Sequence, residues 1–220
     1  MKTNKRNSIN DYLTYFENRG IELGYFKVYQ IKDIEKSCCT NAKTTVIDFD
    51  KIKQKLVADS QLNTIKSCDC MKIRPDKHCI DLIEMKGFVK LIDNFKKLTI
   101  DKEIDGKVAK FNFIKKIEDS LFIIDTLVRR KEFEKTLVDD IFIRDTKINY
   151  TVLTDVDSIN ESFNYIALNF IFYAEYSNSI ENYITTKLET ELLQISNFTH
   201  KLNKPTLITC SEIDSYYLND

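Results

Sequence analysis

The chain has 220 residues, of which 43% are hydrophobic and 30% are charged, a balance typical of a folded protein and not of a disordered one. Its 33 Lys and Arg residues nearly cancel its 34 Asp and Glu residues, so there is no overall positive field for nucleic acid and any polyanion site must be local. No apolar run approaches the roughly 20 residues that cross a bilayer, and the basic N-terminus leads into an amphipathic pattern. We therefore expect a soluble, cytoplasmic protein with a single domain over residues 1–220.

The first part of the chain predicts helices and strands in alternation. Residues 9–18 have the helical period, with Ile9, Leu13 and Phe16 on one face and Gly20 at the end. The next expected elements are a strand over 25–31 (YFKVYQI), a loop over 32–42, an extended segment over 44–49 (TTVIDF) and a helix over 50–62 with Asp50 as its N-cap.

Beyond residue 87 the period becomes helical. Phe88, Ile92 and Phe95 share a face, and the same spacing predicts a long helix from about Lys107 to Glu134. The elements expected after it are a buried strand over 148–156, a helix opened by the capping box of Ser158 and Glu161, a helix with Ile184, Leu188, Leu192 and Ile195 in register, and a strand over 205–210. This order predicts an α/β fold (α+β mixed sheet), with helical additions around a small sheet centred on residues 68–86.

The stretch CDCMKIRPDKHCIDLIEMKG, residues 68–87, has the pattern of a β-hairpin. Pro75 and Asp76 have turn composition, and a turn over 75–78 makes the numbers of paired residues sum to 153. Asp69 then lies opposite Glu84, where two like charges repel unless a cation sits between them. Lys86 points to the same face as Glu84 because strand side chains alternate. This arrangement indicates a metal site.

The opposite face of this hairpin carries a second set of residues, which are Cys68, Cys70, Lys72, Cys79, Asp81, Ile83 and Met85. Lys72 and Asp81 face each other in the same register, so we expect an ordinary cross-strand ion pair there.

Asp69 on one strand and Glu84-Met85-Lys86 on the next resemble the signature of the PD-(D/E)xK nuclease superfamily, which has the restriction-endonuclease-like fold. The likeness is close over residues 60–100 and elsewhere follows the order of helices and strands. An apolar strand that ends in E-x-K-G and pairs with an Asp is much rarer than an E-x-K tripeptide alone.

Two features depart from the pattern of this superfamily. The literal Pro75-Asp76 falls in the turn, so the family's Asp maps onto Asp69, which Cys68 precedes. The acidic residue that many members carry on the first helix has no clear counterpart, and Glu17 and Glu22 are weak candidates for it.

The resemblance implies a nuclease that hydrolyses phosphodiester bonds with Mg²⁺, for which Mn²⁺ could substitute. Asp69, Glu84 and the backbone carbonyl of Met85 would hold the ion, and Lys86 would orient or deprotonate the attacking water or neutralise phosphate charge. The implied partner is nucleic acid, DNA more than RNA, without a membrane, and the chain could form a homodimer or a larger complex. Lys96 and Lys97 are candidates for contact with nucleic acid because they are the basic pair nearest the hairpin.

Other interpretations remain open. The protein could be a non-catalytic interaction or scaffold protein of the same fold, or the charges could form a salt bridge at a solvated sheet end. The basic runs Lys96–Lys97, Lys115–Lys116 and Arg129–Arg130–Lys131 are more typical of solvated helix faces than of phosphate contacts.

Among the six cysteines, Cys68, Cys70 and Cys79 together with Cys38 and Cys39 could in principle bind zinc. Their spacing is not that of common structural zinc sites, so reduced thiols without metal or disulfide are favoured.

Overall fold

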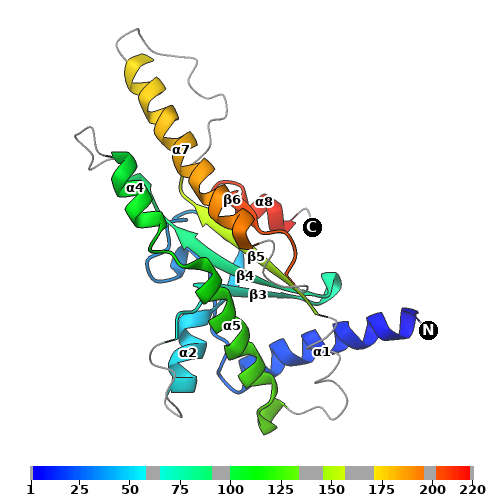
Figure 1. The fold of residues 1–220 in the computed structure, drawn as a ribbon. Coiled ribbons are helices and arrows are strands. Elements are labelled where there is room, and N and C mark those ends of the chain that lie inside the picture. Colours follow the sequence, from blue (N-terminus) through cyan, green and yellow to red (C-terminus); the bar gives the residue numbers. More distant parts are fainter. Residues whose placement is uncertain are drawn as a thin grey trace.

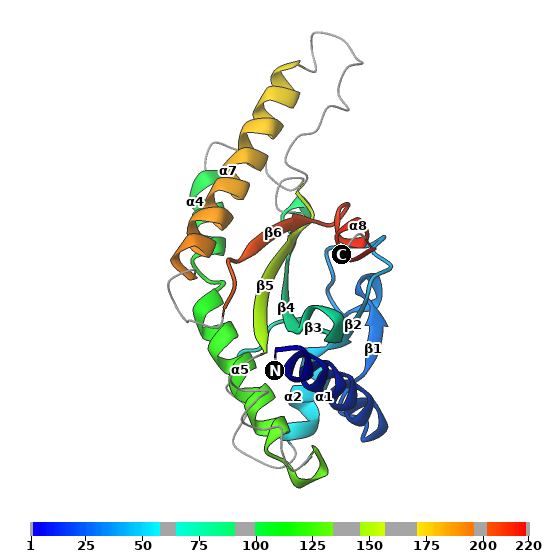
Figure 2. The ribbon, with the colours of Figure 1, turned by 90° about the vertical axis from the view of Figure 1, so that its right-hand side faces the viewer.

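The computed structural model describes residues 2–57, 65–90, 100–133, 146–156, 171–195 and 202–218. Six strands form one mixed sheet in the order β1-β2-β3-β4-β5-β6. The strands are β1 (Val28–Gln30), β2 (Thr45–Asp48), β3 (Cys70–Arg74), β4 (Cys79–Lys86), β5 (Lys147–Thr154) and β6 (Thr206–Thr209). Figure 2 shows them in this order, with β6 beside α7 (Ile171–Ile195) and β1 at the opposite edge.

The other described helices are α1 (Lys2–Glu22), α2 (Phe49–Val57), α4 (Ile100–Val108), α5 (Phe113–Val128) and α8 (Ile213–Leu218), with short 3₁₀ turns at Ile31–Asp33, Pro75–Lys77 and Lys131–Phe133. Among the described helices, none has both the length and the apolar character needed to cross a membrane. The helix expected from Ser158 and most of the one expected from Phe88 lie outside the described residues.

The hairpin has the predicted register. Strand β3 pairs with β4 from Cys70 opposite Ile83 to Arg74 opposite Cys79, and the turn at 75–77 ends at His78 with a left-handed φ of 56°. Strand β4 then pairs in parallel with β5, and β5 in parallel with β6. The predicted α/β class with a mixed sheet centred on the hairpin is confirmed at this level.

Two hydrophobic clusters lie on the two faces of the sheet. On one face Met71, Ile80 and Leu82 pack with residues of α1, α2, α4, α5 and α7. On the other face Ile83 and Met85 pack with the segment after β1 and with Ile213 of α8. Figure 1 shows α4 and α5 on one side of the central strands and α8 on the other. The side chains of β3 and β4 therefore alternate between two largely buried environments.

The N-terminal helix is longer than the sequence indicates. Gly20 lies inside α1, where a Cβ atom would come within 2.1 Å of the Phe26 ring, so this glycine permits close packing and does not end the helix. The chain leaves the helix at Gly24, which has a φ of 68°. At α2 the expected cap also shifts by two residues, because Asp48 and not Asp50 accepts the hydrogen bond from the Lys51 amide, at 3.1 Å.

The single helix expected over 107–134 is wrong. The chain forms α4 and α5 with a break between them, where Asn112 has a φ of 49°. Phe111 and Phe113 flank Asn112 and both pack against the first cluster, Phe111 on Phe88 and Phe113 on Tyr150. Residues two apart on a continuous helix point to nearly opposite sides, so the break lets both rings face the sheet.

Candidate active site

Asp69 and Glu84 meet at one end of the hairpin. The β3–β4 ladder ends with Cys70 opposite Ile83, and Asp69 and Glu84 are the next residues outward on the two strands' chains. The Asp69 side chain accepts a hydrogen bond of 2.6 Å from the backbone amide of Met85, so its carboxylate lies over the strand that carries Glu84. The two residues are therefore cross-strand neighbours, as their pairing sum predicts.

A lysine from α5 joins the two carboxylates. The Lys116 Nζ atom lies 2.5 Å from Oε1 of Glu84 and 3.9 Å from Oδ1 of Asp69. The expectation that Lys116 belongs to a solvated helix face is wrong, since only 17% of its side chain is exposed. The helical spacing of α5 could have revealed this, because Lys116 lies three residues after the buried Phe113 and four before the buried Ser120. It therefore lies on the buried face of the helix.

Two further residues of α5 hold the chain that leads into Asp69. The Asp119 carboxylate accepts a hydrogen bond of 2.9 Å from the Lys66 amide, and the Ser120 hydroxyl accepts one of 2.9 Å from the Cys68 amide. These contacts draw Cys68 into the first hydrophobic cluster, although strict alternation predicts the face of Cys70. Strand β3 begins only at Cys70, so alternation does not extend to Cys68.

Lysines surround the end of β4. Lys86 forms an ion pair with Glu84 and lies 4.7 Å from the centre of the Phe111 ring, on the predicted side of the sheet. Lys107 of α4 donates a hydrogen bond to the carbonyl of Gly87, and burial lowers its pKa. Together with Lys116, three ammonium groups from β4, α4 and α5 lie around residues 84–87.

Burial dominates the electrostatics of Glu84. Its side chain is fully buried, and this burial, followed by the charge of Asp69, raises its pKa above the ordinary value, while Lys86 and Lys116 act in the opposite direction. Burial also opposes the charge on Lys116, but Glu84 and Asp69 outweigh it and raise the pKa of Lys116. The Asp69 side chain is 28% exposed, so solvent reaches the cluster from the Asp69 side.

Two buried oxygen atoms of this region have no hydrogen-bond partner within the described part of the chain. They are Oε2 of Glu84 and the hydroxyl of Tyr150. Burial and the nearby acidic groups, which include Glu84 and Asp69, raise the pKa of Tyr150 strongly. Unpaired buried oxygens of this kind often mark a bound water or ion. The oxygen donors of Asp69 and Glu84 fit a hard divalent cation such as Mg²⁺.

The remaining site candidates lie elsewhere. Lys96 and Lys97 are outside the described residues. Glu22 forms an ion pair of 2.7 Å with Arg19, and Glu17 lies near the charge of Lys72. Neither Glu17 nor Glu22 is thus placed as a partner of Asp69.

The ion pair expected between Lys72 and Asp81 is wrong, although the two residues are opposite each other. Asp81 is fully buried and pairs with Arg74 at 3.4 Å, while Lys72 donates to the carbonyl of Thr45 at 2.8 Å. The longer Arg74 side chain comes from the last residue of β3, so it reaches Asp81 along the same face of the sheet.

The cysteines differ from the expected set of free thiols. Cys39 and Cys210 form a disulfide across 171 residues, which the sequence does not reveal because the two segments meet only in the folded sheet. Cys68, Cys70 and Cys79 are buried free thiols, as predicted. Cys68 and Cys70 lie in different hydrophobic clusters, so they do not face a common site.

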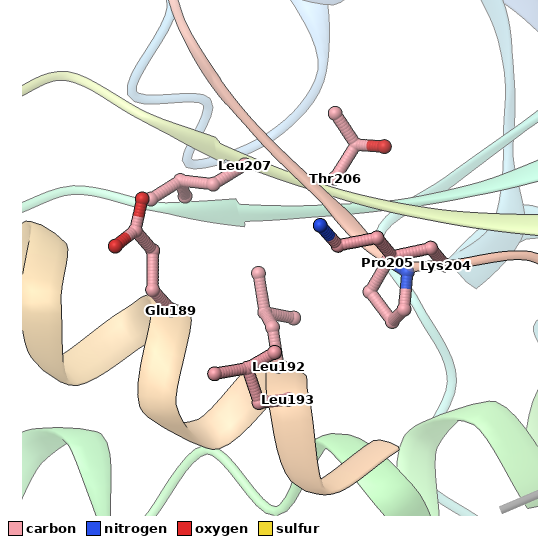
Figure 3. A pocket seen from close by; sticks show the side chains of 7 residues that line it. All are labelled: Glu189, Leu192, Leu193, Lys204, Pro205, Thr206 and Leu207. Carbon is pink, nitrogen blue, oxygen red and sulfur yellow. The ribbon is translucent and has the colours of Figure 1, made fainter. Parts of the chain in front are cut away.

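A separate pocket of about 460 Å³ lies between α7 and the segment that enters β6. Figure 3 shows Glu189, Leu192 and Leu193 of the helix facing the chain from Lys204 to Leu207. These elements carry none of the carboxylates or lysines of the hairpin cluster, so the pocket is distinct from the candidate active site.

The chain matches no protein-family model, and no curated protein and no solved structure is significantly similar to it.

Proposed function

We propose that this protein is a Mg²⁺-dependent nuclease that hydrolyses phosphodiester bonds, with DNA preferred over RNA. The observation that carries the proposal is the meeting of Asp69 and Glu84 across the hairpin with Lys86 beside them, while one oxygen of Glu84 has no protein partner in the described structure. Lys86 and Lys116 balance the two carboxylates in the absence of an ion, and a divalent cation held by both carboxylates would add a further stabilising charge at this buried place.

The residues divide into two roles. Asp69, Glu84 and the carbonyl of Met85 would hold the ion, which lowers the pKa of a bound water and stabilises the leaving oxygen. Lys86 contacts a carboxylate and an aromatic face, and both are partners of an ammonium ion. We therefore assign Lys86 to orientation of the water and neutralisation of phosphate charge in preference to the role of general base.

The fold is consistent with this assignment. A hairpin at the centre of a mixed sheet, extended by the parallel strands β5 and β6 and covered by helices, agrees with the restriction-endonuclease-like core that the sequence suggests. The E-x-K-G run occupies the end of β4, where α4 and α5 bring two further lysines.

Local positive charge supports a polyanionic substrate despite the nearly neutral chain. Lys107 and Lys116 stand beside Lys86, and the partly exposed Asp69 marks the side from which a phosphate would approach. Lysines at this position would contribute affinity that depends on salt and not on sequence.

A second candidate function has one observation in its favour. Lys86 and Lys116 already neutralise Glu84, so the cluster could be a stable charge network in a scaffold protein of the same fold. The two candidates differ in what a divalent ion does to the protein.

The deciding experiment is a cleavage panel of single-stranded and double-stranded DNA and RNA with Mg²⁺, Mn²⁺ or a chelator. We expect cleavage with either ion, none with the chelator, and none for the Glu84→Gln variant, which excludes a contaminating nuclease. If the purified protein cleaves no substrate and binds no Mn²⁺ in a direct titration, the scaffold function is correct.

A further inference from the structure

Three cysteine sulfur atoms gather on the face of the sheet opposite the candidate active site. The Sγ atoms of Cys38, Cys39 and Cys210 all lie within 4.8 Å of one another. Cys39 belongs to the second hydrophobic cluster, and Cys38 and Cys210 pack against it. Within the described residues this is the group of cysteines that the fold brings together.

Backbone contacts position these residues independently of the disulfide. The Cys210 amide donates a hydrogen bond of 2.8 Å to the carbonyl of Thr154, which fixes the chain directly after β6. The Cys39 amide donates one of 3.1 Å to the hydroxyl of Ser37, which shapes the loop that carries both vicinal cysteines. The fold would therefore keep the three sulfurs close after reduction of the disulfide.

The distances from the Cys38 sulfur to the other two sulfurs match those between thiolate ligands of one zinc ion. The Sγ atom of Cys38 lies 3.7 Å from that of Cys210 and 3.9 Å from that of Cys39. Zinc binds thiolate at about 2.3 Å in a tetrahedron, which places two sulfur ligands about 3.8 Å apart. Two edges of a thiolate tetrahedron are thus present already. Reduction of the disulfide would separate Cys39 and Cys210 and supply the third edge.

The same distances argue against a thiol that exchanges with the disulfide. Exchange requires attack along the axis of the S–S bond, whereas Cys38 is nearly equidistant from both sulfurs and so lies beside the bond.

Negative charge near Cys38 favours a cation at this place. The Asp155 carboxylate and Cβ of Cys38 each lie 3.1 Å from the point where a Cβ atom on Gly87 would be. Asp155 also accepts hydrogen bonds from the amides of Phe88 and Val89, so its position beside Cys38 is fixed.

We propose that Cys38, Cys39 and Cys210 form a zinc site when the disulfide is reduced. A dithiol or phosphine reductant supplies two electrons to the Cys39–Cys210 bond and yields two thiols. Zn²⁺ would then bind the three sulfurs as their protons leave to solvent, with a water as the fourth ligand. A two-electron oxidant such as hydrogen peroxide, which is reduced to water, would re-form the Cys39–Cys210 bond and release the ion. The soft thiolate set differs in chemistry from the oxygen ligands of the hairpin cluster, so the two ions would not compete for one site.

The test measures metal binding in the full chain and not cleavage. Protein reduced with a phosphine and freed of reductant without oxygen is titrated with Zn²⁺ against a chromophoric indicator, and with Co²⁺ to detect the thiolate-to-cobalt absorption band. We expect one ion per reduced chain, and none at this site in the oxidised chain. Cys38→Ser should weaken zinc binding by about 10- to 100-fold or more, because loss of a direct ligand costs at least as much as loss of a group that only orients one.

Cys38→Ser is the most useful variant because it keeps both cysteines of the disulfide, so its fold in the oxidised form can be verified by circular dichroism. Cys79→Ser is the matched control, since Cys79 is a buried thiol at the far end of β4 and should leave zinc binding unchanged. The proposal is overturned if reduced wild type binds no zinc, if Cys38→Ser binds it equally well, or if peptide mapping finds Cys38 in the disulfide of the native protein.

Discussion

Lys116 and Glu84 form a buried ion pair between α5 and β4, with 2.5 Å between Nζ and Oε1, and are separated by 32 positions in sequence. With Lys86 on the same carboxylate and Asp69 close by, two positive charges balance two negative ones. The balance explains how a fully buried Glu84 is tolerated without an ion. It also means that Lys116 and a divalent cation act on the same carboxylates.

Replacing Lys116 with Met should therefore strengthen the binding of a divalent ion. The substitution leaves the cluster with one net negative charge, and attraction over a few ångströms at a partly buried position favours binding on the order of 10-fold or more. Cleavage should nevertheless fall about 10-fold, because a lysine that neutralises phosphate charge is lost. Isothermal titration with Mn²⁺ measures the first effect and single-turnover cleavage the second.

Lys115→Met is the control for this variant, because Lys115 precedes Lys116 on α5, is half exposed and pairs with Asp119. It should change neither Mn²⁺ binding nor cleavage. An unchanged Mn²⁺ affinity in Lys116→Met would show that the ion does not bind at Glu84.

The raised pKa of Glu84 predicts how stability depends on pH. A carboxyl group whose pKa in the folded state exceeds its unfolded value of 4.5 stabilises the fold below that pH, and this contribution is lost as the pH rises through the folded pKa. The free energy of unfolding of wild type should therefore fall relative to that of Glu84→Gln as the pH rises from below 4.5 toward neutrality. Urea unfolding without divalent ions, followed by circular dichroism at several pH values, measures the difference. A difference that stays constant with pH would mean that the pKa of Glu84 is unshifted.

Asp81→Ala should destabilise the protein by about 3–5 kcal/mol, because it removes the carboxylate from a buried ion pair and leaves the Arg74 guanidinium without that partner. Asp81 also accepts a hydrogen bond of 2.5 Å from Asn149 on β5, so the loss affects the pairing of two strands. Chemical denaturation measures the change. Cleavage by the folded fraction should be retained, since Arg74 and Asp81 lie toward the turn end of the hairpin.

Two glycines in helices should respond in opposite ways to alanine. At Gly20 the new Cβ would collide with the buried Phe26 ring, and overpacking of this kind costs about 1–3 kcal/mol. At Gly106 nothing lies within 4 Å, and alanine in a helix is favoured over glycine by about 1 kcal/mol. Thermal melting of the two variants should give shifts of opposite sign. A lower melting temperature for both would contradict the assignment of Gly106 to an open helix surface.

The features that could be predicted are those that depend on residues close together in sequence, such as turn composition and the alternation of side chains along a strand. The hairpin register follows from a turn and a period of two, so the sequence already predicts that Asp69 and Glu84 lie close together at the end of the hairpin. Lys116 is different, because a basic pair on a helix looks the same whether it faces solvent or a buried carboxylate. Its role depends on the crossover that lays α5 against β4, and this is tertiary information.

The errors have the same origin. The disulfide between Cys39 and Cys210 depends on two distant segments that meet at the end of β5, and the partner of Asp81 depends on which of two basic side chains turns toward it. The break before α5 follows from two aromatic rings that must both reach the sheet, which overrides a continuous helical period.

Metal binding and chemistry should separate because the cluster assigns them to different residues. Lys86→Ala leaves both carboxylates in place, so it should still bind Mn²⁺ while cleavage falls on the order of 100-fold or more. Asp69→Asn and Glu84→Gln remove ligand charge, so both variants should lose Mn²⁺ binding and cleavage.

Asp76→Asn is the matched control, since Asp76 is an exposed carboxylate in the turn of the same hairpin and should change neither Mn²⁺ binding nor cleavage. Direct titration with Mn²⁺ and single-turnover cleavage separate the two effects for each variant. Full cleavage by Asp69→Asn would remove Asp69 from the active site, and loss of Mn²⁺ binding in Lys86→Ala would mean that this lysine holds the carboxylates in place and does not act on the substrate.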